Sequence, residues 1–298
     1  MATTAAPLID RQFLEKLERL AIRWQKSFPG IVGGHNASRF SGAGQEFLDH
    51  RNFHHGDDLR AVNWRAFMRL EKLFLKMFQI EPRVPVRLLI DTSASMLSGG
   101  DKGNKFDYAR RLAAAFAYVG LVRLDTIVIH PFAERLGDPR ICSGGRHRFG
   151  PVADFLTALT AAGKSDFFQV SRDFVQRHVN RGLIIVISDF LSDTELDKPF
   201  QFLAEFGHEI LLVQLWSDED RLPPWDGELA LTDMETGAEM ELDFDAEARE
   251  RYTAAFDAHC EAVRRTALRH GGRQTGFSTS LSIEEAIFGP VARVRGMQ

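Results

Sequence analysis

The chain has 298 residues, of which 44% are hydrophobic and 26% are charged, the composition of a folded protein with one large domain or two modest ones. Its 37 basic and 41 acidic residues are well mixed and leave a formal net charge of −4, which argues against binding to nucleic acid. The two cysteines, Cys142 and Cys260, lie far apart without a C-x-x-C pair, which argues against a zinc site and a disulfide scaffold.

The N-terminal segment indicates a cytoplasmic protein that begins with an amphipathic helix. It lacks the basic start and apolar core of a signal peptide, and no apolar run in the chain approaches the roughly 20 residues needed to span a bilayer. Asp10 is a candidate N-cap, and apolar residues then recur at steps of three and four: Phe13, Leu17, Leu20, Trp24 and Phe28. We expect this stripe to pack on the body of the protein, with a partner or membrane surface as the alternative.

Residues 41–69, with the sequence SGAGQEFLDHRNFHHGDDLRAVNWRAFMR, concentrate ionisable groups. His50 and His54 are four residues apart and could share a helical face as metal ligands. We favour a structural role, in which Asp57 or Asp58 caps a helix over Leu59–Met68, while Arg51 and Arg60 pair with buried carboxylates such as Glu46. The alternative is a metal-dependent hydrolase or nuclease built from four carboxylates: Glu46, Asp49, Asp57 and Asp58.

Beyond a strand predicted over Leu73–Glu81, we place a domain boundary near Pro82, which separates residues 1–82 from residues 83–298. The second part alternates apolar strands with helical patterns. Its predicted elements are strand Val86–Ile90, helix Lys105–Val122, strand Asp125–Phe132, helix Pro151–Ala161, strand Leu183–Ser188, helix Thr194–Phe206, strand Ile210–Trp216, a hairpin over Leu229–Leu242, helix Ala246–His270, edge strand Gln274–Ser278 and a short helix from Ser282. This order predicts an α/β fold with a doubly wound, mostly parallel, Rossmann-type sheet after an N-terminal α+β region.

Small oxygen-bearing side chains follow the first buried strand of that sheet. Asp91 stands at the carboxyl end of the strand, where ligands bind in open α/β sheets, and Ser93 and Ser95 follow at alternate positions. A loop that curls back can aim these three oxygens at one point, and hard oxygens suit a hard cation. The alternative is a purely structural role, in which Asp91 is the N-cap of the next helix.

The D-x-S-x-S pattern resembles the first motif of the metal-ion-dependent adhesion site (MIDAS) of von Willebrand factor A domains. Most of the chain also resembles the bacterial family called domain of unknown function 58 (DUF58), which couples a D-x-S-x-S strand to the 41–69 signature. The resemblance implies that a second loop supplies Ser165 and a third loop supplies Asp189, which could also cap helix 194–206. The implied metal ligands are Asp91, Ser93, Ser95, Ser165 and Asp189, and the implied ion is Mg²⁺, with Mn²⁺ or Ca²⁺ as alternatives.

A metal ion held mainly by hydroxyls and water keeps its charge and can bind a carboxylate of a partner, which favours a protein-binding function over enzymatic turnover. A serine hydrolase lacks its G-x-S-x-G elbow at Ser93 and Ser95, and an aspartyl phosphatase would need Asp where Ser93 stands. The resemblance implies an adaptor that works beside a MoxR-type AAA+ ATPase. We expect the metal loop to capture a carboxylate of that ATPase or of its client. The role of the 41–69 signature stays open between fold support and a second binding surface.

Overall fold

The computed structural model describes residues 8–27, 46–54, 57, 59, 62–79, 85–99, 103–192, 195–234 and 237–294. Contacts divide the chain into a larger unit, Met1–Phe28 with Val84–Gln298, and a smaller unit, Pro29–Arg83. The expected division was into 1–82 and 83–298. In these units the first helix groups with the larger unit rather than with the signature region, and the smaller unit ends at Arg83.

The larger unit is built on a six-stranded sheet with the strand order β10-β7-β6-β3-β4-β5. Every neighbouring pair is parallel except β4 and β5, which are antiparallel. The strands are β3 (Pro85–Asp91), β4 (Thr126–Phe132), β5 (Arg140–Cys142), β6 (Leu183–Ser188), β7 (Glu209–Trp216) and β10 (Arg273–Ser278). This sheet confirms the α/β, mostly parallel fold expected from the sequence, although β5 was not predicted.

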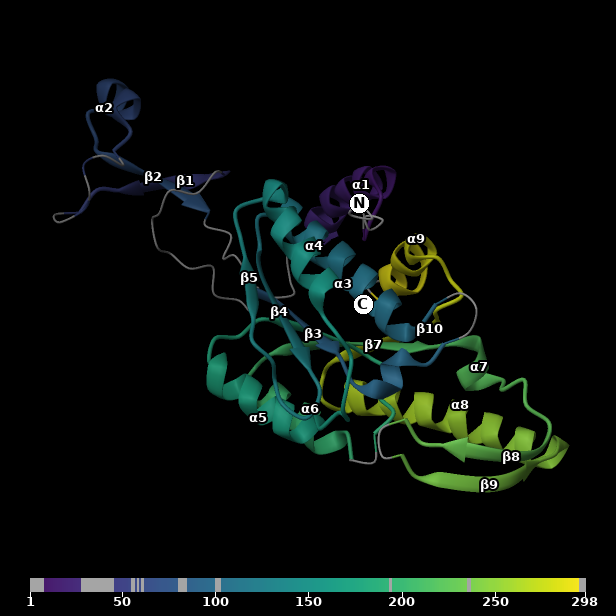
Figure 1. The fold of residues 1–298 in the computed structure, drawn as a ribbon. Helices are drawn as coiled ribbons and strands as arrows, with labels where there is room; N and C mark the ends of the chain where they lie inside the picture. The colour runs from purple at the N-terminus through teal and green to yellow at the C-terminus, as the bar shows by residue number, and fades with distance from the viewer. Residues whose placement is uncertain are drawn as a thin grey trace. The chain divides into compact units, whose positions relative to one another are not determined.

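Helices cover both faces of the sheet, so that the fold is doubly wound (Figure 1). Because side chains alternate along a strand, Leu88 and Ile90 of β3 enter one core and Leu89 enters the other. The first core includes α1 (Arg11–Ser27), α3 (Lys105–Val122) and α4 (Phe149–Ala158). The second core includes α5 (Phe167–Arg177), α6 (Asp197–Glu205) and α8 (Ala246–Arg269). Burial on both faces explains the uninterrupted apolar runs of these strands.

The direction in which the chain winds reverses between β3 and β6. From β3 the chain passes through α3 to β4 on one side, whereas β6 lies on the other side of β3 and leads through α6 to β7. Such a reversal separates the loops that leave two adjacent strands and opens a crevice at their carboxyl ends, where open α/β sheets bind ligands. Asp91 ends β3, and Asp189 directly follows β6.

Helix α1 packs through the first three residues of its predicted apolar stripe, while the side chain of Trp24 and the whole of Phe28 lie outside the described residues. Asp10 caps it by accepting a hydrogen bond from the Phe13 amide at 2.7 Å, and Phe13, Leu17 and Leu20 are buried in the core shared with α3. Glu18 accepts a 2.6 Å hydrogen bond from the hydroxyl of Tyr118, which lies on α3. The helix is therefore part of the core of the larger unit.

The smaller unit contains an antiparallel pair, β1 (Glu46–Asn52) and β2 (Phe74–Gln79), and the helix α2 (Trp64–Leu70). The helix begins later than the predicted Leu59–Met68 because Asn63, rather than Asp57 or Asp58, caps it, accepting from the Ala66 amide at 3.3 Å. The Asp57 carboxylate is instead bound to Arg51 at 2.8 Å and to the His54 amide. Asp58 and Arg60 lie outside the described residues.

The remaining elements are the short helices α7 (Asp218–Arg221) and α9 (Ile283–Ala286), the hairpin of β8 (Gly227–Thr232) and β9 (Glu239–Phe244), the 3₁₀ turns η2 (Ala94–Leu97) and η3 (Arg146–Arg148), and the π-helical turn η4 (Ile287–Val291). The hairpin and the helix after Ser282 confirm the sequence predictions. Within the described ranges, none of the helices combines the length and the apolar character needed to cross a bilayer.

Candidate functional site

The Asp91 carboxylate is fixed between two loops at the carboxyl ends of β3 and β6. Asp91 is completely buried, and its Oδ1 accepts a hydrogen bond from the Ser93 amide at 2.9 Å. Its Oδ2 accepts a 2.6 Å hydrogen bond from the hydroxyl of Ser188, the last residue of β6. Asp91 does not cap α3, because Asn104 does so by accepting from the Asp107 amide. The alternative prediction, that Asp91 is a helix N-cap, is therefore wrong.

The two serines of the D-x-S-x-S pattern meet beyond Asp91. The hydroxyls of Ser93 and Ser95 lie 3.0 Å apart, so that one donates a hydrogen bond to the other. Ser93 is fully buried, whereas Ser95 is partly exposed at the start of η2. The loop thus brings the side chains of Asp91 and Ser93 and the hydroxyl of Ser95 into one oxygen-rich cluster, as the alternating pattern predicted.

The loop that carries Ser165 lies against the Asp91 loop through backbone hydrogen bonds. The Ala94 amide donates to Gly163 O at 2.8 Å, and the Ala162 amide donates to Thr92 O at 2.7 Å. Ser165 is buried, and the next residue, Asp166, caps α5 by accepting from the Gln169 amide at 2.9 Å. Helix α5 was not predicted from the sequence, although an Asp ahead of an amphipathic stretch is a usual helix start.

Asp189 occupies the third loop, directly after β6. Its Oδ1 accepts a hydrogen bond from the Leu191 amide at 3.1 Å, and its Oδ2 accepts one from Lys105 Nζ at 2.8 Å. Asp189 does not cap the next helix, α6, because that helix begins only at Asp197 and its N-cap residue is Leu196. The predicted capping role of Asp189 is therefore wrong. Asp189 does lie beside the Asp91 loop, as predicted.

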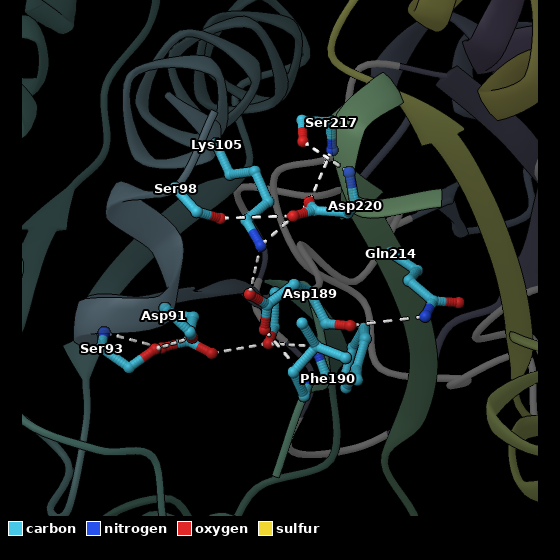
Figure 2. Close-up of polar contacts among 12 residues, drawn as sticks. Asp91, Ser93, Ser98, Lys105, Asp189, Phe190, Gln214, Ser217 and Asp220 are labelled. Atoms are coloured by element: carbon cyan, nitrogen blue, oxygen red, sulfur yellow. Dashed lines mark hydrogen bonds and ion pairs between the residues drawn. The ribbon is translucent and has the colours of Figure 1, made fainter. Parts of the chain in front are cut away.

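The backbone turns sharply at the residue after Asp189. Phe190 has a φ of 57°, a left-handed conformation that a bulky side chain rarely adopts. Its amide donates to the Ser188 hydroxyl at 2.8 Å, and its ring stacks on Phe167 with the ring centres 5.6 Å apart. Such a conformation persists only where surrounding contacts hold it. Beside this turn, the Asp189 side chain points toward Lys105 of α3 (Figure 2).

Lys105, the first residue of α3, places a buried ammonium group in this cluster. Its side chain is 1% exposed, and Nζ lies 2.8 Å from Asp189 Oδ2 and 3.1 Å from Asp220 Oδ2 (Figure 2). Burial alone would lower the pKa of Lys105, but the charges of Asp189 and Asp220 outweigh it and raise that pKa above its usual value. The lysine is therefore charged and paired with carboxylates from two different loops.

Asp220 is held in place by α7. Its Oδ2 accepts a hydrogen bond from the Ser217 amide at 2.8 Å, and its own amide donates to the Ser217 hydroxyl, which completes a capping box. The Tyr252 hydroxyl, on α8, donates to Asp220 O at 2.7 Å. Asp220 was not predicted from the sequence, and Lys105 was predicted only as the first residue of the helix over Lys105–Val122. A lysine next to the apolar stripe of a buried helix was the available signal for Lys105.

The charges of the cluster do not balance. Asp91, Asp189 and Asp220 carry three carboxylates against the single ammonium of Lys105, which leaves two negative charges uncompensated when all are ionised. Burial, and then the neighbouring charge of Asp189, raise the pKa of Asp91 to about 7. A buried carboxylate that resists ionisation marks a place where a positive ligand would be stabilised.

The donor atoms fit a hard cation better than a soft one. In the described part of the chain, no three side chains of the types His, Cys, Asp and Glu converge as metal ligands. A cation here would therefore depend on serine hydroxyls and water in addition to Asp91 and Asp189, which is the oxygen chemistry that Mg²⁺ and Ca²⁺ accept and that Zn²⁺ rarely uses alone. The five residues named from the sequence carry oxygen donors of this kind, and their binding of an ion stays a prediction.

The alternative carboxylate group in the smaller unit is described only in part. Asp57 forms an ion pair with Arg51, whose expected partner was Glu46. His50 Nε2 lies 2.6 Å from Asn63 Nδ2, and its ring meets Phe74 edge-on. Asp58 and the side chains of Glu46 and Asp49 lie outside the described set, so the hydrolase or nuclease arrangement predicted there is not tested.

Curated relatives of the chain are mycobacterial proteins. Uncharacterized protein Rv1480 of Mycobacterium tuberculosis is 26% identical over 262 residues, which cover 86% of this chain and 82% of that protein. Uncharacterized protein MAV169 of Mycobacterium avium is 35% identical over 86 residues, which cover 29% of this chain and 50% of that protein.

Similar solved structures include BatB from Bacteroides thetaiotaomicron, at 15% identity and a TM-score of 0.42 over 72% of this chain and 99% of that chain. The SpRpn10 VWA domain is similar at 11% identity and a TM-score of 0.38 over 69% of this chain and 93% of that chain. A family model described as protein of unknown function DUF58 matches residues 49–262, which is more than half of the chain and includes Asp91, Ser165 and Asp189. The chain therefore belongs to the DUF58 family.

Proposed function

We propose that this protein is a divalent-metal-dependent binding module that recognises a carboxylate of a protein partner, without catalysing a reaction. The observation that carries the proposal is the meeting of Asp91, Ser93 and Ser95 with the Asp189 loop at the switch point of the sheet. The two negative charges that stay uncompensated when Asp91, Asp189 and Asp220 are all ionised equal the charge of one divalent cation.

The residues that would hold the ion are Ser93, Ser95 and Ser165 through their hydroxyls, and Asp91 and Asp189 mainly through water. Mg²⁺ prefers six oxygens and retains several waters, and Mn²⁺ and Ca²⁺ accept similar donors. When bound, such an ion supplies a positive charge that hydroxyls and water leave uncancelled. A carboxylate from outside the chain is the ligand that this charge attracts most strongly.

Apolar side chains close to the site in sequence support a protein partner rather than a small ion or metabolite. Leu97, two residues after Ser95, is 41% exposed, and Leu191, two residues after Asp189, is 39% exposed. Phe168, three residues after Ser165, is 45% exposed. Protein interfaces combine such apolar contacts with a few polar anchors, whereas a small carboxylate ligand would not contact these apolar side chains.

The family resemblance of the sequence suggests the partner, a MoxR-type AAA+ ATPase or the client of that ATPase. An adaptor role beside such an ATPase would be carried out in the cytoplasm, where the ATP that it hydrolyses is available. The carboxylate captured by the metal would then be an Asp or Glu side chain on the ATPase or on its client.

Calorimetric titration of Mg²⁺ and Mn²⁺ tests the metal requirement. Wild-type protein is expected to bind one divalent ion, and Ser93→Ala to bind it at least about tenfold more weakly, because a ligand and the hydrogen bond to Ser95 are lost. Ser143→Ala, an exposed serine far along the chain, is the matched control. Equal affinities in wild type and Ser93→Ala would contradict the metal role of Ser93.

A purified MoxR-type ATPase tests the partner. We expect it to be retained on immobilised wild-type protein with Mg²⁺ present and released by a chelator, and to be retained poorly by Ser93→Ala. Retention that ignores both the chelator and the substitution would contradict carboxylate capture through a metal. Assays with generic phosphodiester and ester substrates complete the test, since turnover abolished by Asp58→Ala but not by Asp91→Ala would favour the hydrolase alternative.

A further inference from the structure

Lys105 is among the largest fully buried side chains of the protein, and its ammonium lies inside the acidic cluster (Figure 2). Burying an ammonium is costly unless carboxylates compensate it, and Asp189 and Asp220 supply that compensation at 2.8 and 3.1 Å. Asp220 is 18% exposed and Asp189 2%, so the closer of the two ion pairs is also the one more shielded from water.

The Lys105 ammonium and a divalent ion would draw on the same carboxylate. Asp189 Oδ2 accepts from Lys105, while the charge of Asp189 is close enough to Asp91 to raise the pKa of that carboxyl. Asp189 directly follows Ser188, whose hydroxyl donates to Asp91 Oδ2 at 2.6 Å, so the carboxylate that pairs with Lys105 is next in the chain to the residue that contacts Asp91. Positive charge at Lys105 reduces the negative potential that Asp189 projects toward Asp91, Ser93 and Ser95.

We propose that Lys105 is an internal competitor of the divalent ion, a positioning residue whose ammonium occupies the Asp189–Asp220 half of the cluster and keeps the cation affinity of the Asp91–Ser93–Ser95 half low. This inference rests on the proposed metal-dependent function and adds its regulation. A weakly held ion gains most from an additional carboxylate, so that metal and partner bind cooperatively.

Asp220 sets the strength of this competition. Because Asp220 accepts one of the ion pairs of Lys105, it takes part of the ammonium charge away from Asp189. The capping box of α7 and the Tyr252 hydroxyl fix its position, and the Ser98 hydroxyl, in the loop after η2, lies 3.5 Å from its Oδ1. A shift of α7 would therefore change how fully Lys105 neutralises Asp189, and with it the affinity for the ion.

Titrating Mn²⁺ and Mg²⁺ into folded variants by calorimetry tests the competition. Lys105→Met removes the ammonium and is expected to bind the ion about tenfold or more tightly than wild type, because Asp189 is freed. Asp220→Asn leaves Lys105 to pair with Asp189 alone and is expected to bind the ion more weakly than wild type. A merely structural role for Lys105 would weaken binding in both variants, so the opposite signs are diagnostic.

Two controls match the size and charge of these changes. Lys198→Met removes a lysine whose side chain is 71% exposed, and Asp154→Asn alters an exposed carboxylate on α4; both are expected to leave the affinity unchanged. The double variant Lys105→Met with Asp220→Asn removes one charge of each sign, so the net charge of the cluster stays that of wild type. It is expected to bind the ion more tightly than Asp220→Asn alone. If Lys105→Met by itself fails to fold, this comparison tests whether Lys105 competes with the ion.

The outcomes separate this inference from the proposed function. If wild type binds no divalent ion but Lys105→Met does, Lys105 is the resident cation of the site, and a metal-dependent function of the wild-type protein is wrong. If removing Lys105 leaves the affinity unchanged or lowers it in both backgrounds, or if no variant binds an ion, the competition is refuted. The comparison of wild type with Ser93→Ala then decides the proposed function independently.

Discussion

Asp91 and Ser188 stand at the carboxyl ends of two adjacent parallel strands and are joined by a 2.6 Å hydrogen bond in which the serine hydroxyl donates to Asp91 Oδ2. The same hydroxyl accepts from the Phe190 amide at 2.8 Å. One buried serine therefore connects the first acidic loop to the turn that follows Asp189. This link explains why the two loops keep a common geometry although almost one hundred residues separate them in the sequence.

Replacing Ser188 with alanine should destabilise the protein and loosen this link. The substitution leaves Asp91 Oδ2 and the Phe190 amide buried without their partner, which costs about 1–3 kcal/mol per unsatisfied group. Urea unfolding monitored by circular dichroism measures the loss. Ser171→Ala is the matched control, because Ser171 is also buried but its hydroxyl bonds only to Phe168 O within its own helix, and its removal should cost under about 1 kcal/mol. Equal losses in the two variants would contradict the linking role of Ser188.

The carboxyl of Asp91 should make folding stability fall as the pH rises from about 4 to 7 in the absence of divalent ions. Its folded-state pKa of about 7 lies above the ordinary value of 3.8, because of burial and then of Asp189. In that interval the folded state holds a proton that the unfolded chain has lost, so stability is lost progressively up to pH 7 and does not change further above it. Asp91→Asn should remove this pH dependence. The loss of unfolding free energy that it removes between pH 4 and pH 7 is on the order of a few kcal/mol.

Unfolding by urea at pH 5 and pH 8, with chelator, measures the Asp91 effect as the difference between wild type and Asp91→Asn. The comparison is needed because burial also raises the pKa of Glu209 to about 7, and that contribution is present in both proteins. Wild type should lose more stability than the variant on going to pH 8. An identical pH dependence in the two proteins would show that Asp91 ionises freely.

Much of the fold and one half of the site were predictable from local sequence. A continuous apolar run followed by an acid predicts a buried parallel strand with a carboxylate at its functional end, which is how Asp91 was identified. Asp189, which follows the apolar strand β6, was named through the family resemblance. The boundaries of α3 followed from its apolar periodicity and agree with the prediction, Lys105–Val122. These features depend on neighbours a few residues away, so a single sequence contains them.

The other half of the candidate site, around Lys105, depends on contacts between segments that are distant in the sequence. Lys105 looks like an ordinary first residue of a helix until Asp189 and Asp220 are placed beside it by two other loops. The wrong prediction that Asp189 caps α6 has a related origin, because α6 begins only at Asp197 and the Asp189 carboxylate instead contacts Lys105 and the Leu191 amide. Competition among partners for one carboxylate is decided by tertiary structure, which local spacing does not encode.

The first helix should be necessary for the stability of the larger unit. Leu17 is completely buried in the core that contains α3, so Leu17→Ala should cost about 2–5 kcal/mol through lost burial and the cavity that remains. Glu15→Ala, an exposed position on the same helix, is expected to change the free energy of unfolding by less than about 0.5 kcal/mol. A neutral effect of Leu17→Ala in urea unfolding would mean that α1 is not part of this core.

Gly182, which precedes β6, should not tolerate a side chain. A Cβ atom there would meet the guanidinium of the buried Arg87 and would lie 2.6 Å from Pro85 O, so Gly182→Ala should cost about 1–3 kcal/mol or more by overpacking. Gly150→Ala is the matched control, because a Cβ at this helical position meets nothing within 4 Å, and alanine should stabilise α4 by up to about 1 kcal/mol. Thermal unfolding of the two variants should therefore shift in opposite directions, and a Gly182→Ala protein as stable as wild type would contradict the close packing of Arg87.

A histidine pair on the opposite side of the fold from the first core should make the protein acid-sensitive. His130 Nε2 lies 2.8 Å from His178 Nε2, and burial, followed by the charge of Arg87, lowers the pKa of His178 to about 4. Between pH 6.5 and 4 the unfolded chain therefore binds a proton that the folded state rejects, so stability falls as the pH falls through this interval. His178→Gln should remove part of that loss, on the order of 1–3 kcal/mol between pH 7 and pH 4.5, in urea unfolding. His147→Gln, at an exposed position, should retain the full wild-type acid sensitivity, and equal behaviour of the two variants would show that the buried pair does not cause it.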